Sequence, residues 1–150
     1  MILIIITIFV LISASIHIRA DYLKQRVKTY IFKPLTTGLI ILICLLQTTE
    51  VSILYKYLIL SGLIFSLMGD IFLMLPSDRF TSGLFSFLIA HIAYMAAFIS
   101  DQGFQPNFLY LIPVIVYGVI LLRILLPYTA SNTIPVIIYS IILIFIAFSA

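Results

Sequence analysis

Three ionisable side chains lie inside or at the edge of long apolar runs, where they could carry acid–base or ion-binding chemistry. Asp70 lies within the run Leu58 to Leu75, Lys33 precedes a second run, and His91 lies in the middle of a third. An Asp at mid-membrane costs about 2.5–3.5 kcal/mol to insert, and ionisable groups at that depth usually mark a functional site. The sequence therefore points to proton transfer or ion binding at Asp70.

Whether Asp70 is ionised or neutral depends on whether it pairs with Lys33. Both residues are expected near the same depth, because Asp70 lies about 8 Å, at helical rise, from the end of its run. If they pair directly, Asp70 stays ionised and could act as a base or an ion ligand. If Lys33 instead reaches the membrane surface or contacts a phosphate, desolvation favours a neutral Asp70 that could donate a proton. A structural tie between two helices is the alternative to both.

Small residues share the Asp70 run and predict close helix packing. Gly62 and Ser66 have the small-xxx-small spacing, and together with Gly69 they are placed on the Asp70 side of the helix. We expect this face to turn the Asp70 carboxylate inward and to form the wall of a cavity.

An aromatic stripe follows one side of the fourth run. Such a stripe is more often packing than chemistry. His91 lies about 15 Å from one end of the run, near mid-membrane, where an imidazole needs a partner. It could be a proton donor, a substrate contact or a core residue, whereas His17 is expected at the interface. The stripe comprises Phe80, Leu84, Phe87, His91, Tyr94 and Phe98.

Composition places all these residues in an integral membrane protein. Only 9% of the 150 residues are charged and 64% are hydrophobic, and the mean hydropathy is +1.32. A soluble domain has about 25% charged residues. The net charge of +3 is too small for a nucleic-acid surface, and no soluble protein partner is indicated. Asp70 and His91 are too few for a zinc site, and no phosphate-binding glycine loop or nucleophile elbow is present, so we expect no metal and no cofactor.

Six apolar runs predict an all-α, polytopic transmembrane bundle in a single domain covering residues 1–150. The runs are continuous rather than alternating, which excludes barrel strands. Pro34, Pro76, Pro106, Pro127 and Pro135 are placed at or near run ends, and Pro113 alone is interior, where a kink is expected. The predicted spans are roughly 2–18, 34–47, 55–75, 81–100, 108–126 and 134–150.

Basic residues predict the orientation of the bundle. The first loop, residues 19–29, has four Lys and Arg residues and one acid, Asp21, which marks it as cytoplasmic. Alternation then places Arg79 and Arg123 on the same side and Lys56 on the other, with both termini outside. The positive charge follows the first run rather than preceding it, so this run is a retained span and not a signal peptide. The compact loops fit a bacterial inner membrane.

Three sequence blocks resemble the YhhN family of membrane lysoplasmalogenases. They are Lys33-Pro34-Leu35, then Gly62-Leu63-Ile64-Phe65-Ser66-Leu67-Met68-Gly69-Asp70, then Phe80-x-x-Gly83-Leu84-x-x-Phe87-x-x-x-His91-x-x-Tyr94. Their order and spacing are similar to those of the family, and the pairing of G-L-x-F-S-x-x-G-D with H-x-x-Y is fairly specific. Members have about eight spans, so the resemblance implies a C-terminally incomplete form of an eight-span fold. The last run, which ends at Ala150 without a polar tail, agrees with that expectation.

The resemblance implies a membrane hydrolase that cleaves the vinyl ether bond of lysoplasmalogens to a fatty aldehyde and glycerophospho-ethanolamine or -choline. Asp70 matches one of two Asp residues that the family is thought to use. Ser66, His91 and Tyr94 would line the site, and Lys33 would attract the phosphate of the lysophospholipid.

One departure from the family pattern leaves other functions open. The second Asp of the family belongs to a later Ser-Asp motif that has no counterpart here, because Asp78 follows Ser77 in a loop directly after the third run. The alternative function is a proton- or cation-coupled carrier that uses Asp70 and His91. A purely structural bundle, in which Asp70 and Lys33 fix the helix register, is a third possibility.

Overall fold

The computed structural model describes residues 2–48, 51–75, 79–103, 108–125 and 133–149. Within these residues, all the regular secondary structure is helical, which confirms the all-α class. The helices are α1 (Ile2–Tyr22), α2 (Arg26–Leu46), α3 (Ile53–Met74), α4 (Phe80–Gln102), α5 (Phe108–Leu125) and α6 (Thr133–Ser149).

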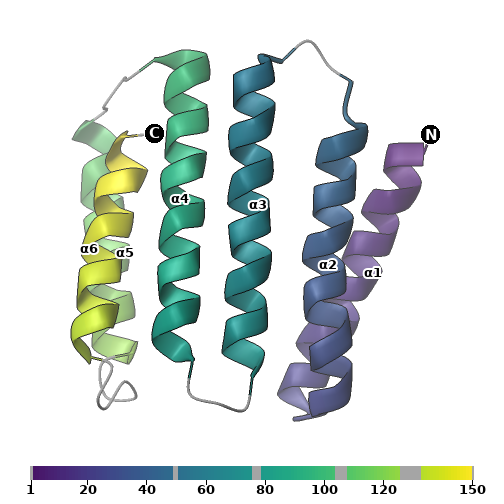
Figure 1. Ribbon diagram of the computed structural model, residues 1–150. Coiled ribbons are helices and arrows are strands. Elements are labelled where there is room, and N and C mark those ends of the chain that lie inside the picture. The colour runs from purple at the N-terminus through teal and green to yellow at the C-terminus, as the bar shows by residue number, and fades with distance from the viewer. Residues whose placement is uncertain (1, 49–50, 76–78, 104–107, 126–132, 150) are drawn as a thin grey trace.

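The helices form an antiparallel row rather than a closed bundle. Successive helices point in opposite directions, so the start of α1 and the end of α6 lie at the same end of the molecule (Figure 1). Each of the first three helices packs on the next one along the chain, and α6 packs on both α4 and α5. The α3–α4 pair therefore lies near the middle of the row, with α1 and α2 on one side and α5 and α6 on the other.

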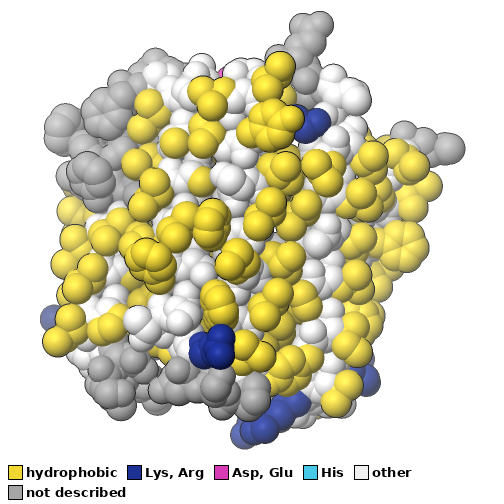
Figure 2. All heavy atoms as spheres, in the orientation of Figure 1, with side chains coloured by type: hydrophobic (Ala, Val, Ile, Leu, Met, Phe, Trp, Pro, Cys, Tyr) yellow, Lys and Arg dark blue, Asp and Glu magenta, His cyan; other side chains and the backbone are white. Residues whose placement is uncertain are grey.

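The outer surface of the row is apolar, as a bilayer requires. Helices α1 to α4 are each long and apolar enough to cross a membrane. Figure 2 shows hydrophobic side chains over most of the visible face, with most of the visible Lys and Arg side chains toward the end that carries the α1–α2 and α3–α4 connections. This clustering agrees with the predicted charge asymmetry, and which end faces the cytoplasm stays a prediction.

Small residues occupy the contacts between helices. Lipid is as apolar as the large side chains, so the hydrophobic effect does not drive helices together in a membrane. They associate instead through close packing of small side chains. Among the described residues, the buried positions are Ser13, Ala20, Gly62, Gly69, Gly83, Ser86, Ala90, Ala97, Gly118 and Val136.

Two predicted boundaries near the first loop are wrong. Helix α2 begins at Arg26 rather than at Pro34, which lies inside it, and α1 continues to Tyr22, so the predicted loop shrinks to residues 23–25. An apolar run marks the part of a helix that lies in hydrocarbon, whereas the hydrogen-bonded helix continues past it with polar residues. Pro113 lies inside α5 as predicted, and Pro135 lies near the start of α6.

The remaining prolines and Asp78 cannot be compared with their predicted positions. Pro76, Pro106 and Pro127 lie outside the described residues, as do Ser77 and Asp78.

Lys56 is the lone cation predicted opposite the basic end, and it has a structural partner there. Its ammonium group donates hydrogen bonds to the carbonyl oxygens of Leu45, at 3.1 Å, and Gln47, at 2.9 Å. These carbonyls belong to the C-terminal end of α2, where the intrahelical donors have run out and a cation is favourable. Lys56 therefore ties the start of α3 to the end of α2.

Glycines bring α3 and α4 into close contact. A Cβ atom at Gly69 would lie 2.8 Å from the ring of Phe87, and one at Gly62 would overlap the ring of Tyr94. The aromatic stripe therefore packs on the small residues of α3. Gly62 and Gly69 face α4 and not the side of α3 on which Asp70 finds its partners, so the predicted common face is wrong.

Replacing Gly69 with Ala is expected to lower the free energy of unfolding by about 1–3 kcal/mol, because the Phe87 ring must move. Gly38→Ala on α2 is the matched control, since nothing lies within 4 Å of a Cβ there. It should be neutral or stabilising by up to about 1 kcal/mol. Thermal unfolding in detergent micelles measures both. Equal losses in the two variants would contradict the close α3–α4 contact.

Candidate active site

The Asp70 carboxylate on α3 lies between two side chains of α2. Its Oδ1 is 3.3 Å from Lys33 Nζ, and its Oδ2 accepts a hydrogen bond of 2.9 Å from Thr37 Oγ1. The Asp70 side chain is 15% exposed and that of Lys33 is 26% exposed. Lys33 and Thr37 are one turn apart on the same side of α2, so a single helix face holds both carboxylate oxygens. Of the two states open from the sequence, the structure contains the direct ion pair.

Thr37 is a site residue that sequence reasoning missed. A Thr inside a helix commonly bonds to its own backbone, and Thr36 does so, with Oγ1 donating to the Phe32 carbonyl oxygen at 2.7 Å. The hydroxyl of Thr36 also meets that of Ser13 at 2.7 Å. The spacing of four residues from Lys33 could have signalled Thr37. The rotation of α2 against α3 decides which of the two threonines reaches Asp70.

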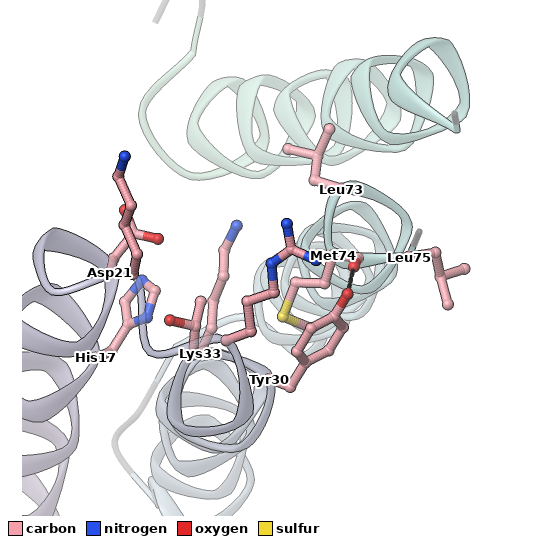
Figure 3. A pocket seen from close by; sticks show the side chains of 10 residues that line it. His17, Asp21, Tyr30, Lys33, Leu73, Met74 and Leu75 are labelled. Atoms are coloured by element: carbon pink, nitrogen blue, oxygen red, sulfur yellow. Dashed lines mark hydrogen bonds between the residues drawn. The ribbon is translucent and has the colours of Figure 1, made fainter. Parts of the chain in front are cut away.

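A further contact between α2 and α3 lies one turn closer to the basic end. The Tyr30 hydroxyl donates to the carbonyl oxygen of Met74 (Figure 3). That carbonyl is among the last of α3, where intrahelical donors are absent. Together with the Asp70 contacts, this bond holds α2 and α3 in one register.

Ser66, Tyr94 and His91 form a second polar cluster, between α3, α4 and α6. Ser66 Oγ and the Tyr94 hydroxyl are 3.2 Å apart. The His91 ring meets the rings of Tyr94 and Tyr139 edge-on, with centroids 6.2 and 6.1 Å away. His91 Nδ1 lies 2.6 Å from the Phe87 carbonyl oxygen. A carbonyl only accepts, so Nδ1 carries the proton in this contact.

The predicted site residues thus fall into two clusters that share α3. Lys33 joins Asp70 at the α2 side, while Ser66 joins Tyr94 at the α4 side. Ser66 and Asp70 are one turn apart along α3, about 6 Å of helical rise. Among the described residues, no hydrogen bond or ion pair connects Asp70 with Ser66, His91 or Tyr94, and no group of three His, Cys, Asp or Glu side chains could hold a metal ion.

A pocket of about 640 Å³ opens where α1, α2 and α3 meet at the basic end. His17, Asp21, Lys24, Arg26, Tyr30 and Lys33 line it on the α1–α2 side, and residues 73–75 line it on the α3 side. We call it the mouth pocket. Lys33 lines the pocket (Figure 3). Its ammonium group also pairs with the Asp70 carboxylate, so Lys33 connects the pocket to Asp70. His17, predicted at the interface, lines the same pocket.

Replacing Thr37 with Val should lower the free energy of unfolding by roughly 1–2 kcal/mol, because Asp70 Oδ2 loses its donor. If Asp70 is catalytic, the same loss should lower its rate by about tenfold. Thr36→Val is the matched control, since Thr36 bonds to Phe32 and Ser13 and not to Asp70. It should lose comparable stability and keep its rate. Equal rate losses in both variants would contradict a specific role for Thr37.

Comparison with known proteins agrees with the helical membrane fold. Residues 28–150 match the YhhN family. The chain is 32% identical over 120 residues to proteins named uncharacterized membrane protein YhhN in Escherichia coli O6:H1, Escherichia coli O157:H7 and Shigella flexneri. Each alignment covers 79% of this chain and 56% of the relative, so the chain spans about half the length of these relatives. No solved structure matches. The chain belongs to the YhhN family of membrane proteins.

Proposed function

We propose that this chain hydrolyses the vinyl ether bond of lysoplasmalogens, releasing a fatty aldehyde and glycerophospho-ethanolamine or -choline. The observation that carries the proposal is the Asp70 carboxylate, held between Lys33 and Thr37 among apolar helices and joined through Lys33 to the mouth pocket. A lysophospholipid that enters from the membrane would have its headgroup at that mouth and its chain among the helices.

One carboxyl group can carry the proton transfers of this reaction. The cycle starts when Asp70 takes up a proton and its pair with Lys33 opens. As an acid, Asp70 then protonates the β-carbon of the vinyl ether, which leaves an oxocarbenium ion and a carboxylate. The carboxylate then takes a proton from the water that attacks the α-carbon, which gives a hemiacetal and restores the acid. The hemiacetal then breaks its bond to the glycerol oxygen while its hydroxyl proton passes to that oxygen, so the products are an aldehyde and a free hydroxyl group. One water is consumed.

Lys33 and Thr37 favour the charged half of this cycle. The Lys33 ammonium group and the Thr37 hydroxyl lie where negative charge appears on Asp70 when its proton leaves. The resulting carboxylate would also face the positive charge of the oxocarbenium ion. Asp70 thus serves as acid and base in turn.

The second cluster would contact the lipid deeper in the membrane. Ser66 and Tyr94 present hydroxyl groups about one turn of α3 farther from the mouth than Asp70. His91 Nδ1 is held by the Phe87 carbonyl oxygen, which leaves Nε2 for a hydrogen bond to the substrate. We assign these three residues to substrate contact rather than to proton transfer.

A carrier that moves protons between Asp70 and His91 has less support. Such a path needs a chain of polar groups, and Asp70 contacts α2 while His91 contacts Phe87, Tyr94 and Tyr139. Within the described part of the chain, no hydrogen bond or ion pair connects the two clusters.

The test is release of fatty aldehyde from a lysoplasmalogen supplied to the purified protein in liposomes. A 1-acyl lysophospholipid with the same headgroup separates ether cleavage from ester cleavage. We expect aldehyde from the vinyl ether substrate and no fatty acid from the ester. A folded protein that gives no aldehyde, but conducts protons or cations across proteoliposomes, would overturn the proposal in favour of a carrier.

A further inference from the structure

The mouth pocket holds two cations, Lys24 and Arg26, that the proposed proton chemistry does not use. Lys24, Arg26 and Lys33 line it, and the nearby carboxylates are Asp21 and the Lys33 partner Asp70. Three Lys and Arg side chains against two carboxylates leave one net positive charge. That balance suits a singly charged anion. Among the described residues, neither Lys24 nor Arg26 has an ion-pair partner.

Lys24 occupies a backbone position that favours glycine. Its φ is 55°, and it is the only described non-glycine residue with a positive φ. The turn closes with Gln25 N–H donating to the Ala20 carbonyl oxygen at 2.8 Å and Lys24 N–H donating to the Asp21 carbonyl oxygen at 2.9 Å. These are the two bonds of a Schellman motif, with Lys24 in the left-handed position that glycine usually takes. A non-glycine residue held in this backbone conformation in a pocket lining points to a function for its side chain.

His17 brings an unsatisfied polar atom to the same pocket. Its Nδ1 is buried and has no hydrogen-bond partner among the described residues. Buried polar atoms in proteins almost always have partners, and an exception calls for an explanation such as a binding role. Figure 3 shows His17 and Asp21 on α1 across from Lys33 and Tyr30 on α2. A polar group of a bound ligand would supply the partner that this atom lacks among the described residues.

The opposite wall of the pocket is apolar, and this favours the phosphate of a lipid over a free inorganic anion. Leu73, Met74 and Leu75 of α3 line that side, and the Tyr30 hydroxyl bond to Met74 holds it in place. A free inorganic ion gains nothing from such a wall. The phosphate end of a lipid, which is charged on one side and continues into glycerol and hydrocarbon on the other, matches both walls.

We infer that the mouth pocket binds the phosphodiester headgroup of a glycerophospholipid, with Lys24 and Arg26 at the phosphate and Lys33 shared between the headgroup and Asp70. This inference rests on the proposed function only in taking the same lipid as the substrate. The pocket lies one turn and more from Asp70 toward the membrane surface, so it would set the depth at which the ether bond meets the carboxyl group.

A lipid that cannot react tests the pocket independently of hydrolysis. The probe is a radiolabelled 1-O-alkyl lysophosphatidylcholine, a saturated ether without a vinyl bond, in equilibrium binding to the full chain in detergent micelles. The variants are Lys24→Gly, Arg26→Gln and, as the matched control, Lys28→Ala, since Lys28 is exposed at the same end but does not line the pocket. Lys24→Gly removes the cation and relieves the turn, so its thermal stability should be unchanged or higher.

We expect Lys24→Gly and Arg26→Gln each to weaken binding by about fivefold, and Lys28→Ala to leave it within about twofold. A 1-O-alkyl glycerol of the same chain length, which lacks the phosphate, should bind at least tenfold more weakly than the probe. Equal effects of Lys24→Gly and Lys28→Ala would overturn the inference, because binding would then depend on overall charge at the surface. Displacement of the probe by inorganic phosphate at concentrations as low as those of the lipid itself would overturn the lipid assignment.

The two proposals can fail separately. Pocket-dependent binding of the saturated lipid, with no aldehyde from a lysoplasmalogen, would overturn the proposed function and leave the headgroup site in place. Aldehyde release together with binding that neither Lys24→Gly nor Arg26→Gln weakens would overturn the headgroup site alone.

Discussion

Replacing Asp70 with Asn should lower the rate of vinyl ether hydrolysis by about 10²- to 10⁴-fold, which is the usual contribution of a general acid–base group. The amide has the size of the carboxyl group but can neither give a proton to the β-carbon nor take one from water. Thr37 can still donate a hydrogen bond to the amide oxygen, so the α2–α3 contact is kept in part. The measurement is the initial rate of aldehyde release in liposomes, at equal amounts of folded protein.

Two further variants make this result specific. Asp70→Glu keeps the charge and can keep the Lys33 pair, but its carboxyl group is displaced by one methylene, so we expect a folded protein with a strongly reduced rate. Asp101→Asn changes an exposed carboxylate at the far end of α4 and should keep the full rate. Full activity in Asp70→Asn would overturn the role of Asp70, whatever the other variants do.

The helices could be predicted from the sequence because the bilayer imposes them. A chain in hydrocarbon must satisfy every backbone N–H and C=O internally, so each long apolar run has to be a helix. The same reasoning located Asp70 and Lys33 near one depth, and the ion pair at 3.3 Å agrees with it. Where an apolar run changes to polar residues, hydropathy no longer shows where the helix begins or ends. Helix α2 therefore begins at Arg26 and passes through Pro34, which hydropathy placed at its start.

The partners of Asp70 could not be predicted, because they depend on how α3 is rotated between two neighbours. At 100° per residue, Asp70 is about 80° around the helix from Gly62 and about 100° from Gly69. Residues that far apart can face one helix or two different ones. In the structure the glycines meet Tyr94 and Phe87 of α4, while Asp70 meets Lys33 and Thr37 of α2. The large rings of α4 fit only over glycine, and that packing turns Asp70 toward α2.

Replacing Lys33 with Met should lower the free energy of unfolding by roughly 1.5–3 kcal/mol, because a partly buried carboxylate loses its charged partner. Met keeps the length and apolar contacts of the Lys stem, so the change isolates the ammonium group. The double variant Lys33→Met/Asp70→Asn should recover most of that loss, since no unpaired charge remains in the membrane. Reversible unfolding in mixed micelles gives the free energy for each variant, and the double-mutant cycle gives the coupling between the two side chains.

The same cycle separates a catalytic pair from one that only fixes the helix register. If the pair were structural, the double variant would regain hydrolysis together with stability, because two neutral side chains can keep α2 and α3 aligned beside the Tyr30 contact. A catalytic Asp70 predicts the opposite combination, a stable protein that releases no aldehyde. Lys33→Arg completes the argument: it keeps a cation near Asp70 and should retain both stability and much of the rate. Recovery of aldehyde release in Lys33→Met/Asp70→Asn would therefore assign the ion pair to the fold alone.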